Sequence, residues 1–387
     1  MTLPTLTGAM AGARETALTA PDLTVVVPTF NERDNVRPLI DALDEALAHI
    51  HWEVVFVDDD STDGTAAAVR AISRQDSRVR CVQRVGRRGL SSAVIEGILA
   101  SSAPYVAVMD GDLQHDPAIL PKMYAELRTQ PLDIVVGSRY VQGGGLGDWS
   151  ESRGKISGMA TRLAKLVVTA DLADPMSGFF MITRPAFETA MRRLSGQGFK
   201  ILLDLFASAP TPYRFKEIPF VFRKRMTGES KLDTMAVWEY LLLLLDKSIG
   251  RYVPVRFALF SAVGALGIGV HLLVLRATLA ALGFSSAQAL ATIVAMTNNF
   301  LLNNFFTYRD RRLHGWRMVR GLLTFWLVCG FGAVANVGVA SFVFRQNTAW
   351  WVSGLTGAAI SAVWNYAASS IVTWPGNRAR PTASVGN

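Results

Sequence analysis

The sequence predicts an α/β domain with a mixed, mostly parallel sheet, followed by an all-α membrane domain of four helices. Three observations predict this architecture. Short β-branched apolar runs alternate with helical stretches early in the chain, which is typical of a parallel sheet covered by helices. Half of the 387 residues are hydrophobic and only 18% are charged. The charges concentrate before about residue 256, and the long apolar runs follow it.

The first part of the chain contains four predicted strands with helices between them. The strands are Leu23–Pro28, Glu53–Val57, Tyr105–Met109 and Asp133–Val136, and the helices include Val36–His49 and Thr65–Ser73. In sheets of this kind ligands bind beyond the carboxyl ends of the strands. Chemically reactive or polar residues follow the strands, namely Pro28-Thr29-Phe30-Asn31-Glu32, Asp58-Asp59-Asp60-Ser61 and Asp110-Gly111-Asp112. The sequence therefore predicts a site at this edge of the sheet.

Two carboxylates, Asp110 and Asp112, follow the third predicted strand directly and are separated by Gly111. Carboxylates at this spacing can share one divalent cation, and Gln114 offers a third oxygen from the same turn. Such hard oxygen ligands suit Mg²⁺ or Mn²⁺, which also binds a substrate diphosphate. We expect the ion to offset the charge that develops on a leaving nucleoside diphosphate.

The aspartates after the second predicted strand allow two interpretations. Asp58, Asp59 and Asp60 can cap the following helix, which opens after Asp63. A carboxylate at a strand end can also accept hydrogen bonds from a nucleobase or a ribose.

Basic residues form a second candidate group for binding anions. Arg139 follows the fourth strand, Arg153 and Ser157 lie one helical turn apart, and Arg225 and Lys231 lie in a glycine-containing loop. Guanidinium forks fit phosphate oxygens, so phosphate binding is favoured over a solvated surface. The net charge of +8 also agrees with an anionic partner. No aromatic–basic stripe or nucleic-acid-binding motif is present, and we expect no nucleic acid partner.

Four apolar stretches after Pro254 are long enough to cross a hydrocarbon core of about 30 Å. They are Phe257–Leu275, Ala287–Phe306, Leu322–Phe344 and Trp350–Ile371. Arginines gather before the first, between the second and third, and after the fourth: Arg251, Arg256, Arg309, Arg311, Arg312, Arg317, Arg320, Arg378 and Arg380. By the positive-inside rule, we expect a multi-pass protein of the cell membrane whose N-terminal domain and both termini are cytoplasmic.

The remaining segments set the expected domain boundaries. Residues 1–21 are small and polar without the apolar core of a signal peptide, and predict a disordered tail. The α/β domain is expected over residues 22–235, an interfacial helix or linker over 236–252, the membrane domain over 253–374 and a tail over 375–387. Residues 155–170 also alternate basic and apolar side chains, as membrane-surface helices do. Ordinary helices packed on the sheet are the alternative for both segments.

Several motifs together resemble family 2 glycosyltransferases of the GT-A fold. They are Pro28-Thr29-Phe30-Asn31-Glu32, Val57-Asp58-Asp59-Asp60-Ser61-Thr62-Asp63-Gly64-Thr65, Asp110-Gly111-Asp112-Leu113-Gln114-His115 and Gly137-Ser138-Arg139-Tyr140. Gly198-Phe199-Lys200-Ile201-Leu202-Leu203-Asp204 is similar to the dolichol- or polyprenol-phosphate mannose synthases, which usually have Glu at the Asp204 position. The family usually has Gly or Asn at the Asp60 position, before Ser61. The membrane part resembles the GtrA-type domain.

This resemblance implies roles for particular residues. Pro28, Phe30, Glu32 and Asp59 would line the nucleotide pocket, and Asp110, Gly111 and Asp112 would meet the nucleotide-sugar. Asp110, Asp112 and Gln114 would hold Mg²⁺ or Mn²⁺. Arg139 and Arg225 would contact donor phosphates, with Lys231 nearby. Arg153 and Ser157, together with Arg139, would hold the lipid phosphate.

The reaction that the resemblance implies is transfer of mannose from GDP-mannose to polyprenyl or dolichyl phosphate at the lipid bilayer. Three alternatives remain open. The chain could be a polyprenyl-phosphate glucosyltransferase that uses UDP-glucose. It could be a lipid-linked sugar translocator with a non-catalytic soluble domain. A processive polysaccharide synthase shares the fold, but the chain has no Gln-x-x-Arg-Trp segment for a growing polymer.

Overall fold

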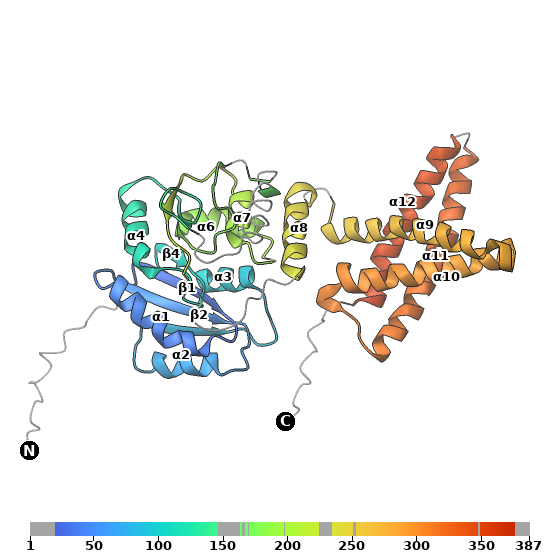
Figure 1. Cartoon of the computed structure of the whole chain (residues 1–387). Helices are drawn as coiled ribbons and strands as arrows, with labels where there is room; N and C mark the ends of the chain where they lie inside the picture. The colour runs from blue at the N-terminus through green and yellow to red at the C-terminus, as the bar shows by residue number, and fades with distance from the viewer. Residues whose placement is uncertain are drawn as a thin grey trace, which may run out of the picture. The chain divides into compact units, whose positions relative to one another are not determined.

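The structure is a computed structural model that describes residues 20–145, 163–164, 167–168, 170–196, 198–223, 234–250, 253–346 and 349–375. The chain divides into two compact units, Met1–Ser248 and Ile249–Asn387. Figure 1 shows that the first contains a sheet with helices on both faces, and that the second is helical. This confirms the predicted α/β domain followed by an all-α region.

The first unit contains a seven-stranded sheet in the order β3-β2-β1-β4-β6-β5-β7. Among the strands that the structure describes, only β6 runs antiparallel to its neighbours, so the sheet is mixed and mostly parallel. The elements are β1 Leu23–Thr29, α1 Arg33–Ala46, β2 Trp52–Asp58, α2 Thr65–Ser73, β3 Val79–Gln83, α3 Leu90–Leu99, β4 Tyr105–Val108, η1 Pro117–Ile119, α4 Leu120–Thr129, β5 Ile134–Ser138, β6 Phe180–Thr183, α6 Arg184–Ala190, η2 Met191–Arg193, α7 Ile201–Ser208, β7 Phe215–Pro219 and α8 Thr234–Ile249.

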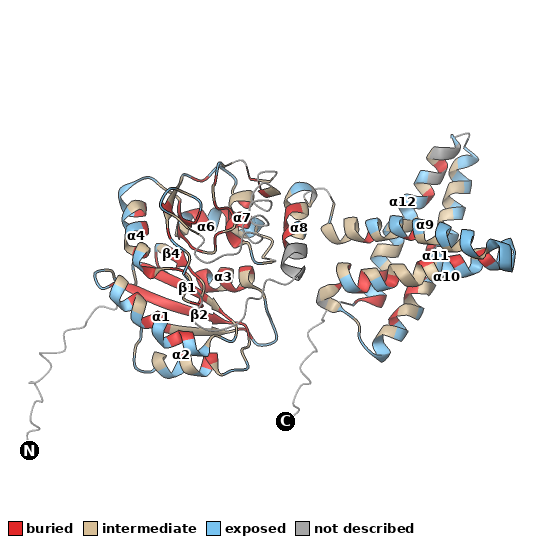
Figure 2. Cartoon of the chain, in the orientation of Figure 1, coloured by how far each residue is buried: buried red, intermediate tan, exposed pale blue. Residues whose placement is uncertain are grey.

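Two apolar cores cover the two faces of the sheet, because successive strand side chains point to opposite sides. Val25 of β1 packs in one core with α1, α2 and α4, and its neighbour Val26 packs in the other with α3, α6 and α7. Figure 2 shows the buried strands between these helices. The double burial explains why the central strands have nearly continuous apolar sequences.

The last helix of this unit, α8, packs on α7. Tyr240, Leu243 and Leu244 of α8 form a third buried cluster with Leu203 of α7. Within the segment predicted over residues 236–252, helix α8 therefore packs on the α/β unit, and residues 251–252 lie outside the described residues. The other proposed surface helix, over residues 155–170, lies largely outside the described residues.

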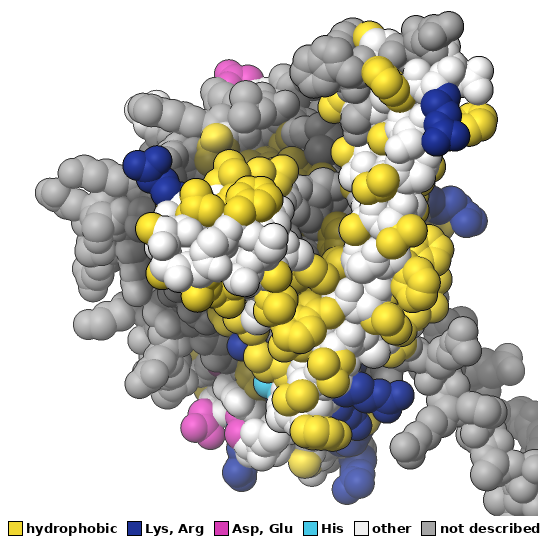
Figure 3. Space-filling model, turned by 90° about the vertical axis from the view of Figure 1, so that its right-hand side faces the viewer, with side chains coloured by type: hydrophobic (Ala, Val, Ile, Leu, Met, Phe, Trp, Pro, Cys, Tyr) yellow, Lys and Arg dark blue, Asp and Glu magenta, His cyan; other side chains and the backbone are white. Residues whose placement is uncertain are grey.

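The second unit consists of four long helices, two of which end in short π-helical turns. They are α9 Val255–Leu282, α10 Phe284–Leu302, η3 Asn303–Thr307, η4 Arg309–Arg311, α11 Trp316–Phe344, α12 Trp350–Ala368 and η5 Ser369–Thr373. Among the described residues, α9 and α11 are long and apolar enough to cross a membrane. The count of four spans stays a prediction. Hydrophobic side chains cover much of the face seen in Figure 3.

The two helical hairpins of this unit are built alike. A glycine on the first helix lies against an asparagine on the second, as Gly267 with Asn299 and Gly332 with Asn365. The π-helical turns η3 and η5 are followed by Tyr308 and Trp374, whose rings stack 4.3 Å apart. The two hairpins therefore meet in a closed aromatic cluster, to which Phe260 also belongs.

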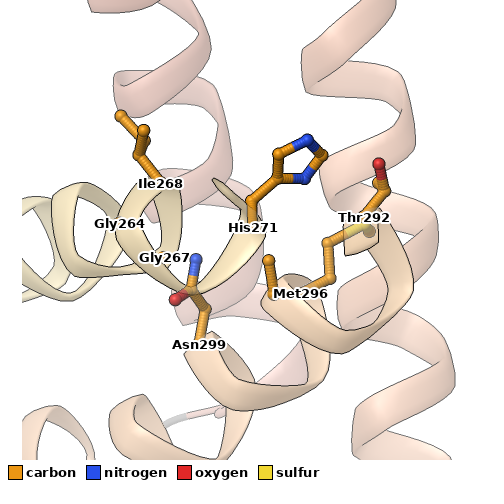
Figure 4. Close-up of a pocket in the computed structure, with 8 residues that line it drawn as sticks. Gly264, Gly267, Ile268, His271, Thr292, Met296 and Asn299 are labelled. Atoms are coloured by element: carbon orange, nitrogen blue, oxygen red, sulfur yellow. The ribbon is translucent and has the colours of Figure 1, made fainter. Parts of the chain in front are cut away.

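Polar side chains in this unit join segments or line a pocket. Asn304 accepts hydrogen bonds from Leu313 N at 2.8 Å and Trp374 Nε1 at 3.0 Å, so it links three segments. A pocket of about 280 Å³ lies between α9 and α10. Figure 4 shows His271 and Asn299 among the side chains around it.

Candidate active site

The carboxyl ends of β1, β2 and β4 meet at one edge of the sheet. Asp59 N donates a hydrogen bond to Thr29 O at 2.9 Å, which joins β1 to β2. Gly111, just after β4, approaches β1 so closely that an added Cβ would lie 3.1 Å from Thr29 Cγ2 and 3.3 Å from Val27 Cγ1. Only glycine allows this approach without displacement, so the Asp110–Asp112 turn reaches the β1 end as the sequence predicted.

His115 fixes the start of the acidic turn. Its Nδ1 accepts a hydrogen bond from Asp110 N at 3.0 Å, and its ring stacks on Phe179 with 4.9 Å between centroids. Burial lowers the pKa of His115 below its ordinary value, although the nearby Asp110 raises it. The imidazole is therefore neutral at pH 7 and, because Nδ1 is an acceptor, carries its proton on Nε2.

The residues of the acidic turn fit a divalent cation. Burial raises the pKa of Asp110, because the charged carboxylate is poorly solvated. A bound cation would oppose this rise and favour the charged form. Asp112 is buried and accepts from Gln114 N at 3.1 Å, and Gln114 Nε2 donates to Arg223 O at 3.1 Å, which orients the amide. Among the described residues, no three His, Cys, Asp or Glu side chains form a metal site. Two carboxylates and an amide suit Mg²⁺ or Mn²⁺, which takes its other ligands from water and substrate phosphates.

Arg139 is held beside the turn by Asp174. Its Nε and Nη2 each donate to the Asp174 carboxylate at 2.8 Å, and its backbone N donates at 3.1 Å. Asp174 is fully buried and its backbone N is bound by Glu217. Burial disfavours the charged guanidinium, but the two bonds with Asp174 outweigh it and raise the pKa of Arg139. Asp174 therefore positions a permanent cation near Asp110.

Lys200 is a second cation at this edge, and the sequence-based site did not include it. Its Nζ donates to Met176 O at 3.3 Å, in the loop that also carries Asp174 and Gly178. An added Cβ at Gly178 would lie 3.4 Å from both carboxylate oxygens of Asp110, so this loop adjoins the acidic turn. Burial lowers the pKa of Lys200, and the positive Arg139 lowers it further.

The Lys200 position carried a signal that was overlooked. Lys200 is the N-cap residue of α7, where Ser, Thr, Asp and Asn are preferred and where a cation opposes the helix dipole. A lysine at such a position, after a glycine-rich loop, indicates a requirement other than helix stability.

A basic loop between β3 and α3 lies over the end of β1. The Arg88 guanidinium stacks on the Phe30 ring at 4.2 Å. The Asp59 carboxylate holds this loop in place, because it accepts hydrogen bonds from Arg84 Nη1 at 2.6 Å and Gly89 N at 2.7 Å. Burial raises the pKa of Asp59, and these two donors oppose the rise. In this structure the Asp59 carboxylate therefore holds the loop that carries Arg88.

The other predicted residues divide into two groups. Pro28 lies in β1 opposite Val57, and Glu32 is the N-cap residue of α1, where its Oε2 accepts from Asn35 Nδ2 at 2.6 Å. Both are at the same strand end as Phe30. The predicted phosphate ligands Arg153, Ser157, Arg225 and Lys231 lie outside the described residues.

The described residues thus place three carboxylates, an amide oxygen and two cations around the end of β4, and one of these carboxylates, Asp174, is paired with Arg139. Such a site can bind a divalent ion and an anionic substrate together. An arrangement of fixed charges of both signs stabilises a leaving anion without reorganising during the reaction.

Comparisons with known proteins agree with both units. Residues 24–190 match the family described as glycosyl transferase family 2, and residues 259–374 match the GtrA/DPMS transmembrane domain. The dolichol-phosphate mannosyltransferase of Pyrococcus furiosus is 34% identical over 361 residues, which cover 91% of this chain and 99% of that protein. The dolichol-phosphate mannosyltransferase of Saccharomyces cerevisiae is 36% identical over 248 residues, covering 62% and 91%.

Among solved structures, this chain is similar to glucosyl-3-phosphoglycerate synthase from Mycobacterium tuberculosis in complex with Mn²⁺, uridine-diphosphate and glucosyl-3-phosphoglycerate. The identity is 21%, the TM-score is 0.44, and the match covers 59% of this chain and 80% of that one.

Proposed function

The chain belongs to the dolichol-phosphate mannosyltransferase family of membrane glycosyltransferases, and we propose that it transfers mannose from GDP-mannose to a polyprenyl phosphate. The observation that carries the proposal is the acidic turn Asp110–Asp112 at the end of β4, with Lys200 and Arg139 beside it. Both substrates are phosphate anions, and this site provides the cations and carboxylates that such a reaction requires.

Asp110, Asp112 and Gln114 would hold Mg²⁺ or Mn²⁺. The bound ion would supply charge neutralisation for the donor diphosphate. Arg139 and Lys200 add two cations from the protein, and we assign Arg225 and Lys231 to the same donor phosphates. His115 keeps Asp110 in place through its neutral ring and contributes no charge of its own.

The donor nucleotide would lie over the end of β1, with Pro28, Phe30, Glu32 and Asp59 around it. Arg88 favours GDP over UDP, because a guanidinium fork matches the N7 and O6 acceptors of guanine and uracil has no such pair. Asp59 contributes by fastening the loop that carries Arg88. The alternative donor is UDP-glucose, which would retain the enzyme class and change the sugar.

The acceptor phosphate is already an anion at neutral pH, so the reaction needs alignment of two anions and no strong base. We assign Arg139, Arg153 and Ser157 to the lipid phosphate. In-line attack on the anomeric carbon would invert it and give a β-linked product from an α-linked donor.

The membrane unit would keep the α/β unit at the bilayer surface, where the lipid acceptor resides. We propose four spans, with the α/β unit and both termini on the cytoplasmic side. The closed aromatic cluster where the two hairpins meet, around Tyr308 and Trp374, favours an anchor over a translocation path.

The proposal is tested with the purified full-length protein, polyprenyl phosphate, Mn²⁺ and either radiolabelled GDP-mannose or UDP-glucose. We expect label from GDP-mannose in the organic phase. Label from UDP-glucose alone would overturn the sugar assignment, and no label from either donor would overturn the enzyme proposal. Flipping of lipid-linked mannose in liposomes by Asp112→Ala protein would then support the translocator instead.

A further inference from the structure

Asp204 of α7 and Lys247 of α8 form a buried ion pair away from the acidic turn. Lys247 Nζ lies 2.6 Å from Asp204 Oδ1, and the two side chains are 10% and 0% exposed. Taking two charges out of water is costly, and a well-packed apolar pair is often at least as stable as a buried ion pair. Stability alone therefore gives no sufficient reason for this pair, and its hydrogen bonds indicate another role.

Both members of the pair hold the end of η2 and the residues that follow it. Asp204 Oδ2 accepts hydrogen bonds from Ser195 N at 2.9 Å, Ser195 Oγ at 2.8 Å and Gly196 N at 3.3 Å. Lys247 Nζ donates to Arg193 O at 3.1 Å. The positive and negative groups thus fix backbone atoms of Arg193, Ser195 and Gly196, which an apolar pair could not do.

This segment leads directly to Lys200. Gly198 O accepts from Ser91 N at 3.2 Å, which attaches the segment to α3. Asp204 N in turn donates to Lys200 O at 3.0 Å within the first turn of α7. That backbone bond is part of the helix and does not depend on the Asp204 side chain. Lys200 therefore lies between the segment that the Asp204 side chain holds and the first turn of α7, and its Nζ reaches Met176 O beside the acidic turn.

We propose that the Asp204–Lys247 pair positions the loop before α7 so that Lys200 reaches the donor phosphates. Neither residue of the pair touches the reacting groups, and both act through Lys200. The inference rests on the proposed function, since its readout is mannosyl transfer. It also gives α8, the last helix of the α/β unit, a part in catalysis.

The first test separates positioning from packing with an apolar replacement of the pair. Asp204→Asn and Lys247→Met each leave one buried charge without its counter-charge, so both should lower Tm and reduce kcat/KM for GDP-mannose at least about tenfold. Asp204→Leu/Lys247→Met should recover much of the Tm that the single variants lose, while kcat/KM for the donor stays at least about tenfold low and KM for polyprenyl phosphate is unchanged. Recovery of kcat/KM together with Tm would overturn the proposal.

A second test avoids unpaired buried charges. Ser195→Ala removes one hydrogen bond to Asp204 but leaves the ion pair intact, and we expect kcat/KM for the donor to fall about threefold or more with a smaller decrease in Tm than in Asp204→Asn. In a Lys200→Ala background the same change should have no further effect, because Ser195 acts through Lys200. If the effects of Ser195→Ala and Lys200→Ala on kcat/KM multiply in the double variant, the proposal is contradicted. Wild-type protein without any transfer would refute the proposed function instead, so the two failures are distinguishable.

Discussion

Lys200 gives the site a titratable cation, and this sets a pH dependence. Burial lowers its pKa below the ordinary value of a lysine, so the charge is lost at a lower pH than for an exposed lysine. We expect kcat/KM for the donor to fall as pH rises through that lowered pKa. Lys200→Arg should move the decrease to higher pH, since a guanidinium keeps its charge. If kcat/KM of this variant falls at the same pH as that of the wild type, another group is responsible for the titration.

Arg88 should set the preference for the nucleobase. We expect Arg88→Ala to reduce the ratio of GDP to UDP affinity about tenfold, because the guanidinium fork that matches guanine is lost. Arg87→Ala is the matched control, since Arg87 lies in the same loop but pairs with Glu96 at 2.8 Å. Isothermal titration of both nucleotides measures the ratio. Equal changes in the two affinities would show that Arg88 binds phosphate and does not read the base.

At the scale of the element, α3 packs on the sheet through Gly97. An added Cβ would lie 2.9 Å from Val57 Cγ2 and would also contact Val26. Gly→Ala in a helix normally stabilises by about 1 kcal/mol, but overpacking costs about 1–3 kcal/mol. We expect Gly97→Ala to lower Tm. Gly338→Ala in α11 is the control, because an added Cβ there would have no atom of another segment within 4 Å. This change should leave Tm unchanged or raise it. Equal Tm changes would contradict the close packing of α3.

The sequence predicted the buried central strands but not the edges of the sheet. β1, β2, β4 and β5 have apolar runs because both of their faces are covered. The missed β3 and β7 are edge strands that contain charged residues such as Arg80 and Lys216. The buried β6, which lies between β4 and β5, was missed as well. Their places depend on pairing across the sheet, which no local pattern records.

Asp110, Asp112 and Gln114 could be grouped from the sequence because one turn contains all three, and their role as metal ligands stays a prediction. The candidate site was not predictable where partners are distant in sequence. The contact between Lys200 and the loop of Asp174, and the pair between Asp59 and Arg84, arise only when strands and loops are assembled.

At the scale of the whole molecule, the arginine-rich loop between η3 and α11 should face the cytoplasm with the α/β unit. In a protein whose Cys81 and Cys329 are replaced by Ser and Ala, His314→Cys should react with an impermeant maleimide in inside-out vesicles only. Ser285→Cys, at the start of α10, should react in right-side-out vesicles only. Both sites are exposed in the structure. Labelling of both from one side would contradict the proposed topology.

The whole account depends on chemistry at the end of β4, so the most direct measurement is transfer of radiolabelled mannose from GDP-mannose to polyprenyl phosphate by full-length variants in liposomes. Asp112→Asn removes a ligand charge, and we expect its rate to fall at least about 100-fold, with EDTA reducing the wild-type rate similarly. Asp116→Asn, in the same turn but paired with the exposed Arg223, should stay within about threefold of wild type. An Asp112→Asn protein as active as Asp116→Asn would contradict the assignment of this site.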